Sequence, residues 1–260
     1  MRSTTSDSAD IVPIRRIVLM PWISFGKSDR QVAAVGLPED DFEVYDSEDS
    51  AAQISGVLNI FEPSQRVIDL GAGRGRIALP LAGHGVEVLA VDRDVQALTH
   101  SGWTDHEHVE RLDEDFLSPH ATWFDQGPVD GVVCLGNTLN LVNDTDHALE
   151  VFQRAFRALA AGGSFLIDDF PVWGPDMIRT EWPLGTSPDG TQQVVWSSCG
   201  RSFAYRTGSD VDSKRRFPGS EERLLRAWTI DELEKMASKS GFGPPRHDEA
   251  ALMIDFARSD

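Results

Sequence analysis

The residues best suited to bind a small ligand form a glycine-rich stretch, Val67-Ile68-Asp69-Leu70-Gly71-Ala72-Gly73-Arg74-Gly75. An apolar run that ends in closely spaced glycines is typical of a buried strand and a tight turn, where the backbone can approach a ligand at the start of a helix. A side chain on Gly71 or Gly73 would then meet the ligand or that helix. The dinucleotide fingerprint differs, because it needs a third small residue where Arg76 stands. The Asp69 carboxylate suits a cationic or hydroxyl-bearing ligand better than a pyrophosphate.

Two further carboxylates follow apolar runs. Asp92 comes directly after residues 86–91, about 20 residues after Gly71, where a carboxylate can accept hydrogen bonds from both hydroxyls of a ribose. Asp115 follows a weaker run at 109–112 and could accept a hydrogen bond from an exocyclic amine, such as that of adenine. Three acids at successive strand ends beside one glycine loop predict a nucleoside site that lacks a phosphate clamp.

These residues need a parallel sheet to position them, and the sequence predicts one. Short apolar runs at 66–70, 86–91, 109–112, 129–135 and 164–167 suit strands that are buried on both faces. Between the last two, residues 145–160 place Leu149, Phe152, Phe156 and Leu159 on one helical stripe, and Gly162 is expected to stop the helix. This alternation predicts an α/β fold built from βαβ units.

The pattern changes after Asp168. Residues 193–199, 202–207 and 223–228 resemble strands separated by polar turns, and the segment 169–228 has equal numbers of acidic and basic residues. We expect a β-rich insertion there. A capping box of Thr229 and Glu232 then begins a helix that ends at Gly241, and residues 252–256 would return to the sheet as one of about seven core strands.

Composition excludes several classes of protein. The chain has 42 Asp and Glu residues against 24 Lys and Arg residues, a net charge of −18, which disfavours binding to nucleic acid or to anionic membranes. Neither a membrane span nor a signal peptide fits, and two distant cysteines, Cys134 and Cys199, predict free thiols and a cytoplasmic protein. The first ten residues are expected to be disordered. The acidic stretch 39–49 is either a solvated face or an attractor for a cationic substrate.

The motifs VIDLGAGRGR, AVDRD and DEDF resemble the S-adenosylmethionine (SAM) site of class I methyltransferases. The resemblance covers residues 46–168 and 229–260, with 1–45 as an N-terminal extension and 169–228 as the insertion. It implies a Rossmann-like, seven-stranded, mostly parallel sheet with helices on both faces. It also implies that SAM is held by Asp69, Gly71, Ala72 and Gly73 at its methionine end, by Asp92 at the ribose, and by Asp115 and the Phe116 backbone at the adenine, with Arg93 alongside.

The segment after the fourth strand, DGVVCLGNTLNL, is similar to that of small-molecule N-methyltransferases of the glycine N-methyltransferase type. The similarity implies main-chain contacts to SAM from Leu135 and Gly136, and a place for Asn137 near the transferred methyl group. In that group an insertion after the fifth strand often covers the substrate or mediates association, so 169–228 could form a homodimer contact. The N-terminal half of the glycine enzyme has no recognisable match in this chain.

Other constellations give weaker predictions. His100, His106 and His108 have a loosely metal-like spacing, but a solvated helix or loop suits them better, and no metal is expected. His147 would begin the helix after the fourth strand, close to the substrate. The aromatic residues of the insertion either wall a substrate pocket or form the core of the insertion, namely Trp173, Trp182, Trp196, Phe203 and Tyr205. The basic run Lys214-Arg215-Arg216 is interpreted as an exposed turn.

The sequence therefore predicts transfer of a methyl group from SAM to a small molecule, most simply to an amine nitrogen. An amine attacks in its neutral form, which burial favours, so it needs no strong general base. Two alternatives stay open. An O-methyltransferase would use His147 or Asp169 as the base, and a non-catalytic protein could bind SAM without turnover. A nicotinamide-dependent dehydrogenase shares the fold but does not suit Arg76 or the fourth-strand segment.

Overall fold

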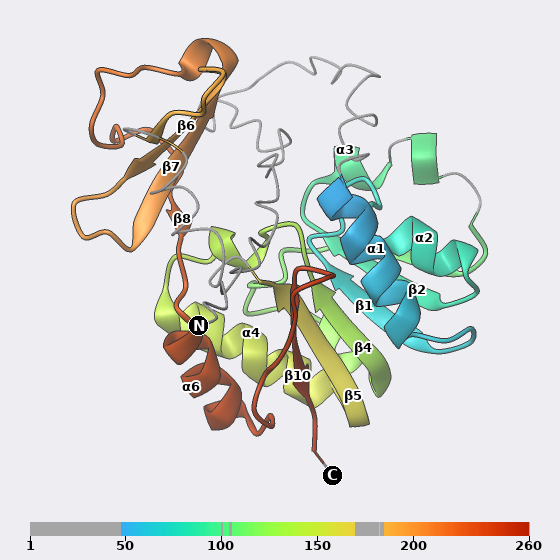
Figure 1. Ribbon diagram of the computed structural model, residues 1–260. Helices are drawn as coiled ribbons and strands as arrows, with labels where there is room; N and C mark the ends of the chain where they lie inside the picture. The colour runs from blue at the N-terminus through green and yellow to red at the C-terminus, as the bar shows by residue number, and fades with distance from the viewer. Residues whose placement is uncertain (1–47, 100, 104–105, 170–181, 183–184, 260) are drawn as a thin grey trace, which may run out of the picture.

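The computed structural model describes residues 48–99, 101–103, 106–169, 182 and 185–259 (Figure 1). The whole of the predicted N-terminal extension 1–45, most of the acidic stretch 39–49, and the residues His100 and Trp173 lie outside the described residues.

The core is a seven-stranded sheet in the order β3-β2-β1-β4-β5-β10-β9. Five strands are parallel, namely β1 (Arg66–Leu70), β2 (Glu87–Asp92), β3 (Val109–Asp113), β4 (Val129–Cys134) and β5 (Leu159–Asp168). β10 (Met253–Ala257) and β9 (Arg246–Asp248) add an antiparallel edge. The predicted Rossmann-like architecture is confirmed. Successive strands are added on one side of β1 up to β3 and then on its other side from β4 onward. A ligand is expected at the carboxyl ends of β1 and β4, where this direction changes.

Helices cover both faces of this sheet (Figure 1). One face packs against α1 (Glu48–Ile60) and α2 (Ala78–Gly83), with Val57 and Leu81 in the core. The other packs against α4 (Thr145–Ala158) and α6 (Ile230–Ser240), around Phe152 and Trp228. Shorter helices complete the fold, namely α3 (Val95–Leu98), η2 (Ser101–Trp103), η3 (Trp123–Asp125), η4 (Leu139–Leu141) and η6 (Gly208–Asp210).

The end of α4 differs from the sequence prediction. The helix ends at Ala158 rather than at residue 160, and Leu159 already begins β5. Gly162, predicted to stop the helix, instead lies inside β5 with a φ of 78° and donates its N–H to the Arg258 carbonyl. The strand therefore begins five residues earlier than residue 164. By contrast, α6 has the predicted capping box of Thr229 and Glu232, and Gly241 ends it with a φ of 103°.

The insertion after β5 forms a separate antiparallel sheet of β6 (Gln192–Trp196), β7 (Ser202–Thr207) and β8 (Leu225–Arg226). Figure 1 shows it in orange beside the core. Phe203, Tyr205 and Trp182 are buried together in its own small core, with Trp196 packed against them. The interpretation as an insertion core therefore holds for these residues. The predicted basic turn at 214–216 is exposed.

The second sheet is attached to the segment that follows β4. Leu141 of η4 packs into the core of the insertion. Asn143 Nδ2 donates to the Leu224 carbonyl at 2.7 Å, and Trp228 Nε1 donates to the Leu139 carbonyl at 3.2 Å. The insertion and the loop after β4 are thus held in one fixed arrangement.

Two negative findings apply to the residues described above. None of their helices is long and apolar enough to cross a membrane. Nor do the His, Cys, Asp and Glu side chains of these residues gather into a group able to hold a metal ion. His106 is exposed, and Nδ1 of the half-buried His108 lies 2.7 Å from Oε1 of Glu87.

Candidate functional site

Two glycines of the loop after β1, Gly71 and Gly73, differ in what surrounds them. Gly71 and Gly73 both have positive φ angles, of 72° and 54°, a region that residues with a side chain adopt at a cost. A β-carbon on Gly71 would lie 2.5 Å from the Thr138 side chain, so the expected obstacle at this position is Thr138 rather than a ligand or the next helix. A β-carbon on Gly73 would have no atom within 4 Å. Gly71 is needed for packing, whereas Gly73 faces open space.

The two carboxylates predicted at strand ends lie beside this loop. The oxygens of Asp92 accept hydrogen bonds from the N–H groups of Gly73 and Asp94, each at 2.8 Å. Each oxygen can accept a second hydrogen bond, so Asp92 retains capacity for two ligand hydroxyls. Asp115 lies 3.5 Å from Nη1 of Arg93, and its Oδ1 accepts from the N–H of Leu117 at 2.9 Å. Both acids are therefore held in fixed positions.

The backbone carbonyl of Phe116 is already hydrogen-bonded within the protein. Its carbonyl oxygen accepts hydrogen bonds from Trp123 Nε1 at 3.0 Å and from Arg154 Nη1 at 2.7 Å. A carbonyl oxygen has two lone pairs, and these two donors use both. A backbone contact from Phe116 to a ligand would therefore come from its N–H.

These residues line a cavity with two lobes. The larger lobe has a volume of about 330 Å³ and the smaller about 130 Å³. Both lobes are lined by Gly71, Gly73, Asp92, Arg93, Leu141 and Arg223. The larger lobe adds Asp69, Ala72, Arg74, Arg76, Ile77, Asp94, Ala97 and Leu135. The smaller lobe adds Asp115, Phe116, Leu117, Thr138 and Val142. The cavity thus brings together every predicted cofactor-binding residue except Gly136, which is next to Leu135 in the chain.

Two buried polar atoms in the larger lobe lack a hydrogen-bond partner within the described part of the chain, Asp69 Oδ2 and Arg74 Nη1. Asp69 is only 3% exposed and Arg74 only 9% exposed. Burial raises the pKa of Asp69 to about 7, and the nearby Asp92 adds to this rise, while Arg76 opposes it. Buried polar groups cost free energy until they are paired. This lobe therefore suits a ligand that carries both an ammonium and a carboxylate.

The turn after β4 is held by Asp168 at the end of β5. Its carboxylate accepts hydrogen bonds from the N–H of Gly136 at 2.9 Å, the N–H of Asn137 at 2.6 Å and Nε2 of Gln53 at 2.9 Å. Asn137 has a φ of 59°, a strained backbone conformation that these bonds help to maintain. Burial raises the pKa of Asp168, and the hydrogen bond from Gln53 opposes the rise.

None of the predicted catalytic residues lines either lobe, although Asn137 is next in the chain to Thr138, which does. Oδ1 of Asn137 accepts a long hydrogen bond of 3.4 Å from Asn140 Nδ2. His147 lies in the first turn of α4 with its side chain 60% exposed. Asp169 is buried 3.6 Å from Nδ1 of His247, and burial raises its pKa to about 6 although His247 lowers it. Catalytic roles for these residues stay predictions.

Sequence reasoning missed several residues of the site. Arg74 and Arg76 stand inside the motif that was recognised, and their position between and after the glycines could have marked them. Asp168 follows an apolar run just as Asp92 does, so the same signal was present. Arg223 reaches the cavity from the insertion, and no local pattern indicates it.

Comparison with known proteins agrees with this geometry. Residues 67–163 match the family model of a methyltransferase domain. YqeM of Bacillus subtilis (strain 168), a protein named as a methyltransferase, is 27% identical over 188 residues, which cover 68% of this chain and 73% of YqeM.

Two solved structures share the fold at low identity. CalS10, an amino pentose methyltransferase from Micromonospora echinaspora, aligns with a TM-score of 0.57 and 15% identity over 87% of this chain and 100% of its own. KedS8, a sugar N-methyltransferase from a Streptoalloteichus species, aligns with a TM-score of 0.56 and 18% identity over 92% and 99% of the two chains.

The sheet order, the glycine loop and the acids at the strand ends define a class I methyltransferase fold. Within that class, the domain match and the cavity identify the protein as an enzyme, a SAM-dependent methyltransferase. The residues present fit SAM, because Asp69 Oδ2 and Arg74 Nη1 offer partners for its α-ammonium and α-carboxylate groups. Gly73 leaves room that a β-carbon would fill.

Proposed function

We propose that this enzyme methylates the nitrogen of a small amine. The observation that carries the proposal is the set of titratable side chains in the cavity. Among the described residues that line it, the titratable side chains all belong to aspartates or arginines, and none is His, Lys, Tyr or Cys. Arginine does not deprotonate in proteins, and Asp92, Asp94 and Asp115 are engaged by backbone N–H groups. The remaining carboxylate, Asp69, is taken in this proposal by the α-ammonium of SAM. An amine that binds in its neutral form needs no base, whereas an alcohol does.

In this proposal the residues of the larger lobe hold the methionine end of SAM. Asp69 accepts from the α-ammonium, Arg74 donates to the α-carboxylate, and the loop Gly71-Ala72-Gly73 approaches the ligand with its backbone. Two charged partners of opposite sign fix both the position and the direction of that end.

The remaining contacts fix the nucleoside. Asp92 accepts from the ribose hydroxyls, and Asp115 and the N–H of Phe116 contact the adenine. Arg93 keeps Asp115 in place through their ion pair. Leu135 and Gly136 contact SAM with their main chain. When bound, SAM supplies a methyl group on a sulfonium that a nucleophile can take directly.

Catalysis by the chain is then mainly a matter of orientation. Asp168 fixes the Gly136–Asn137 turn, and Asn137 orients the acceptor beside the methyl group. Alignment of reacting groups can supply a large part of a rate enhancement without proton transfer by the protein. His147, which is exposed, and Asp169, which pairs with His247, are poorly placed to serve as the base of an O-methyltransferase.

Two further observations support a small amine. The net charge of −18 attracts cations and repels nucleic acid. The fold is also that of CalS10 and KedS8, whose descriptions name an amino pentose and a sugar nitrogen. Amino sugars therefore belong in the first panel of acceptors, beside amino acids and simple amines.

The test is product analysis with isotope-labelled SAM on matched amines and alcohols of the same carbon skeleton. We expect label on nitrogen, located by mass spectrometry and NMR, and a rate that rises with pH until the bound amine is neutral. Label on oxygen or carbon, with all amines inert, would refute the proposal while leaving the SAM site intact.

Association through the insertion remains a separate proposal. Phe217, between β7 and β8, is 63% exposed and offers an apolar contact to a second copy. Sedimentation of the wild type and of Phe217→Ser would test it, with a dimer that persists in the variant counting against this contact.

A further inference from the structure

Helix α1 reaches the turn after β4 through one buried side chain. Gln53 is only 4% exposed, and its Nε2 donates to Oδ1 of Asp168 at 2.9 Å. The same oxygen accepts from the N–H of Gly136, and the other carboxylate oxygen accepts from the N–H of Asn137. A helix that precedes β1 in the chain and a turn that follows β4 therefore meet at one buried carboxylate.

The orientation of the Gln53 amide is fixed by the chemistry of its partner. An ionised carboxylate only accepts hydrogen bonds, so the amide must present its N–H₂ group to Asp168, and the reverse orientation would set two oxygens against each other. With Nε2 engaged in this way, Oε1 is buried without a hydrogen-bond partner among the described residues. An unpaired buried amide oxygen costs free energy. Gln53 is therefore better explained by its contact with Asp168 than by the stability of α1.

The same amide lies beside a second strained residue. Leu252, just before β10, has a φ of 54°, a backbone region that is costly for a residue with a side chain. Its carbonyl accepts from the N–H of Asp169 at 2.9 Å and from Nε2 of Gln53 at 3.4 Å. Asn137, at the other end of this network, is also strained, with a φ of 59°. Strained residues persist where their surroundings determine them, and they cluster at functional sites.

We propose that Gln53 is a positioning residue for methyl transfer, because through Asp168 it holds the turn Gly136–Asn137 where Asn137 orients the methyl acceptor. This inference rests on the proposed function, which gives Asn137 that task. It adds α1 to the elements on which the orientation of the acceptor depends.

The contact also controls the charge of Asp168. Burial raises the pKa of this carboxyl, and the hydrogen bond from Gln53 is the largest of the interactions that oppose the rise. Protonation would set an O–H donor against one of the donors that Asp168 now accepts from, and so would loosen the turn. The other charged or titratable groups that act on Asp168 or on its neighbour in the chain come from several elements, namely Arg76, Cys134, Asp169, His247 and Glu249.

The experiment follows the amide protons of Gly136 and Asn137 by NMR in the full ¹⁵N-labelled chain, against pH and without acceptor. The transition that disappears in Asp168→Asn belongs to Asp168, which separates it from the titration of Asp69 and Asp169. We expect Gln53→Met to move this transition to higher pH by about one pH unit or more, since a hydrogen bond to a charged group is lost. Gln53→Glu, which sets a second carboxylate against Asp168, should move it further.

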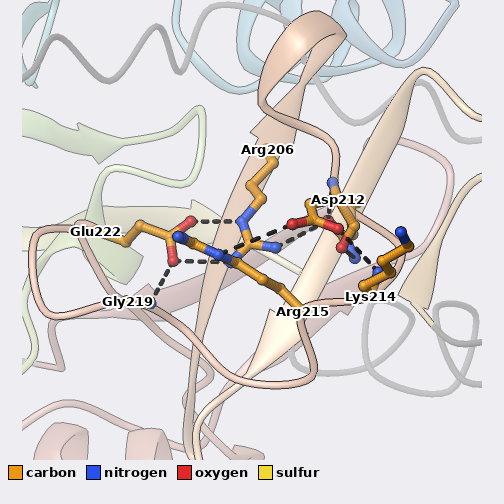
Figure 2. A network of polar contacts seen from close by, with 7 residues as sticks. Arg206, Asp212, Lys214, Arg215, Gly219 and Glu222 are labelled. Carbon is orange, nitrogen blue, oxygen red and sulfur yellow. Dashed lines mark hydrogen bonds and ion pairs between the residues drawn. The ribbon is translucent and has the colours of Figure 1, made fainter.

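Gln193→Met is the matched control. Gln193 is also a buried glutamine, 1% exposed, and its Nε2 donates to the Asp212 carbonyl at 2.9 Å. Its partners Arg206 and Asp212 belong to the polar network of the insertion in Figure 2, which does not include Asp168. Val57→Ala is a second control, because it removes a buried contact of α1 that is remote from this hydrogen bond in kind. Neither control should move the transition.

Each outcome decides the proposal. An unmoved transition in both Gln53 variants overturns it, and so does an equal movement in Val57→Ala, since a loosened helix would then account for the shift. If Gln53→Met does not fold, Gln53→Glu alone decides. With an accepted substrate, the acid limb of kcat should move together with the NMR transition while KM for SAM changes little. A kcat that keeps the pH dependence of the wild type overturns the positioning role. Methyl transfer to oxygen would refute the amine proposal and leave the NMR result unaffected.

Discussion

The pH dependence of SAM binding tests the role of Asp69, because the pKa of this carboxyl, about 7, lies within the pH range in which binding can be measured. Burial raises that pKa in the unliganded protein, and the positive charge of an ammonium next to Oδ2 would lower it. Binding of SAM therefore releases a proton from Asp69 at pH values below about 7. The affinity for SAM should rise with pH up to this value and then level off, until the α-ammonium of SAM loses its own proton.

The size of the effect follows from the ionised fraction. For a pKa of about 7, the carboxyl is about 76% ionised at pH 7.5 and about 3% ionised at pH 5.5, so affinity should fall about 25-fold between them. This window lies below the ordinary pKa of an α-amino group, about 7.7–8.0, so the ammonium of SAM stays mostly protonated across it. Calorimetry in buffers of different ionisation enthalpy measures both the affinity and the released proton.

Asp69→Asn supplies the decisive comparison. The variant should bind SAM more weakly at pH 7.5, show little dependence on pH, and release no proton. Without ligand at pH 8, it should also be more stable than the wild type. The reason is that a raised pKa means stability present below about pH 4 that is lost as pH rises through about 7. A pH dependence that survives unchanged in Asp69→Asn would refute the assignment of Asp69 to the ammonium.

Three further substitutions test other parts of the site. Gly73→Ala and Gly190→Ala both place a β-carbon at a positive φ with open space around it, so each should lower the free energy of unfolding by about 1–2 kcal/mol. In calorimetry, only Gly73→Ala should abolish S-adenosylhomocysteine binding. Asp92→Asn should weaken that binding by about 10-fold or more, since one ribose hydroxyl loses a charged acceptor. In Asp168→Asn the side-chain oxygen keeps the place of Oδ1, which accepts from Gln53 and Gly136, and the amide N–H₂ is set against the N–H of Asn137. We therefore expect kcat to fall by about 10-fold or more in steady-state assays while S-adenosylhomocysteine affinity changes little.

The sheet and the cofactor loop could be predicted because their signals are local. A strand buried on both faces needs a continuous apolar run, and 66–70 and 86–91 supply it within six residues or fewer. Parallel strands then place the next residues at one edge of the sheet, which is why the sequence alone assigns Asp92 and Asp115 to a common site.

The end of α4 could not be predicted for a physical reason. Helical periodicity continues through Leu159, whose side chain is buried in β5, as the apolar stripe of a helix would also require. What ends the helix is the pairing of Leu159 and the residues after it with β4 and β10, and such pairing depends on distant segments. A glycine with positive φ, here Gly162, is compatible with a helix end and with an irregular strand, so it does not decide between them.

Arg223 marks the limit of sequence reasoning at the site. Its neighbours in the chain, SEER and LLRAW, contain no binding motif. Its position depends on the buried pair of Arg206 and Glu222 and on Asn143, which are 17, 1 and 80 residues away in the chain. Contacts of that kind exist only after the two sheets have formed.

The unpaired atoms of Asp69 and Arg74 connect stability with function. The folded protein buries both groups and leaves each with an unmatched atom, although apolar residues there would cost less free energy. A ligand with complementary charges removes this cost in the folded state only, so at a SAM concentration of about 100 times Kd the free energy of unfolding should rise by about 2.7 kcal/mol. Without a ligand, these two groups make the folded protein less stable than apolar residues would. In the proposed arrangement, the same two atoms select the end of SAM that carries an ammonium and a carboxylate together.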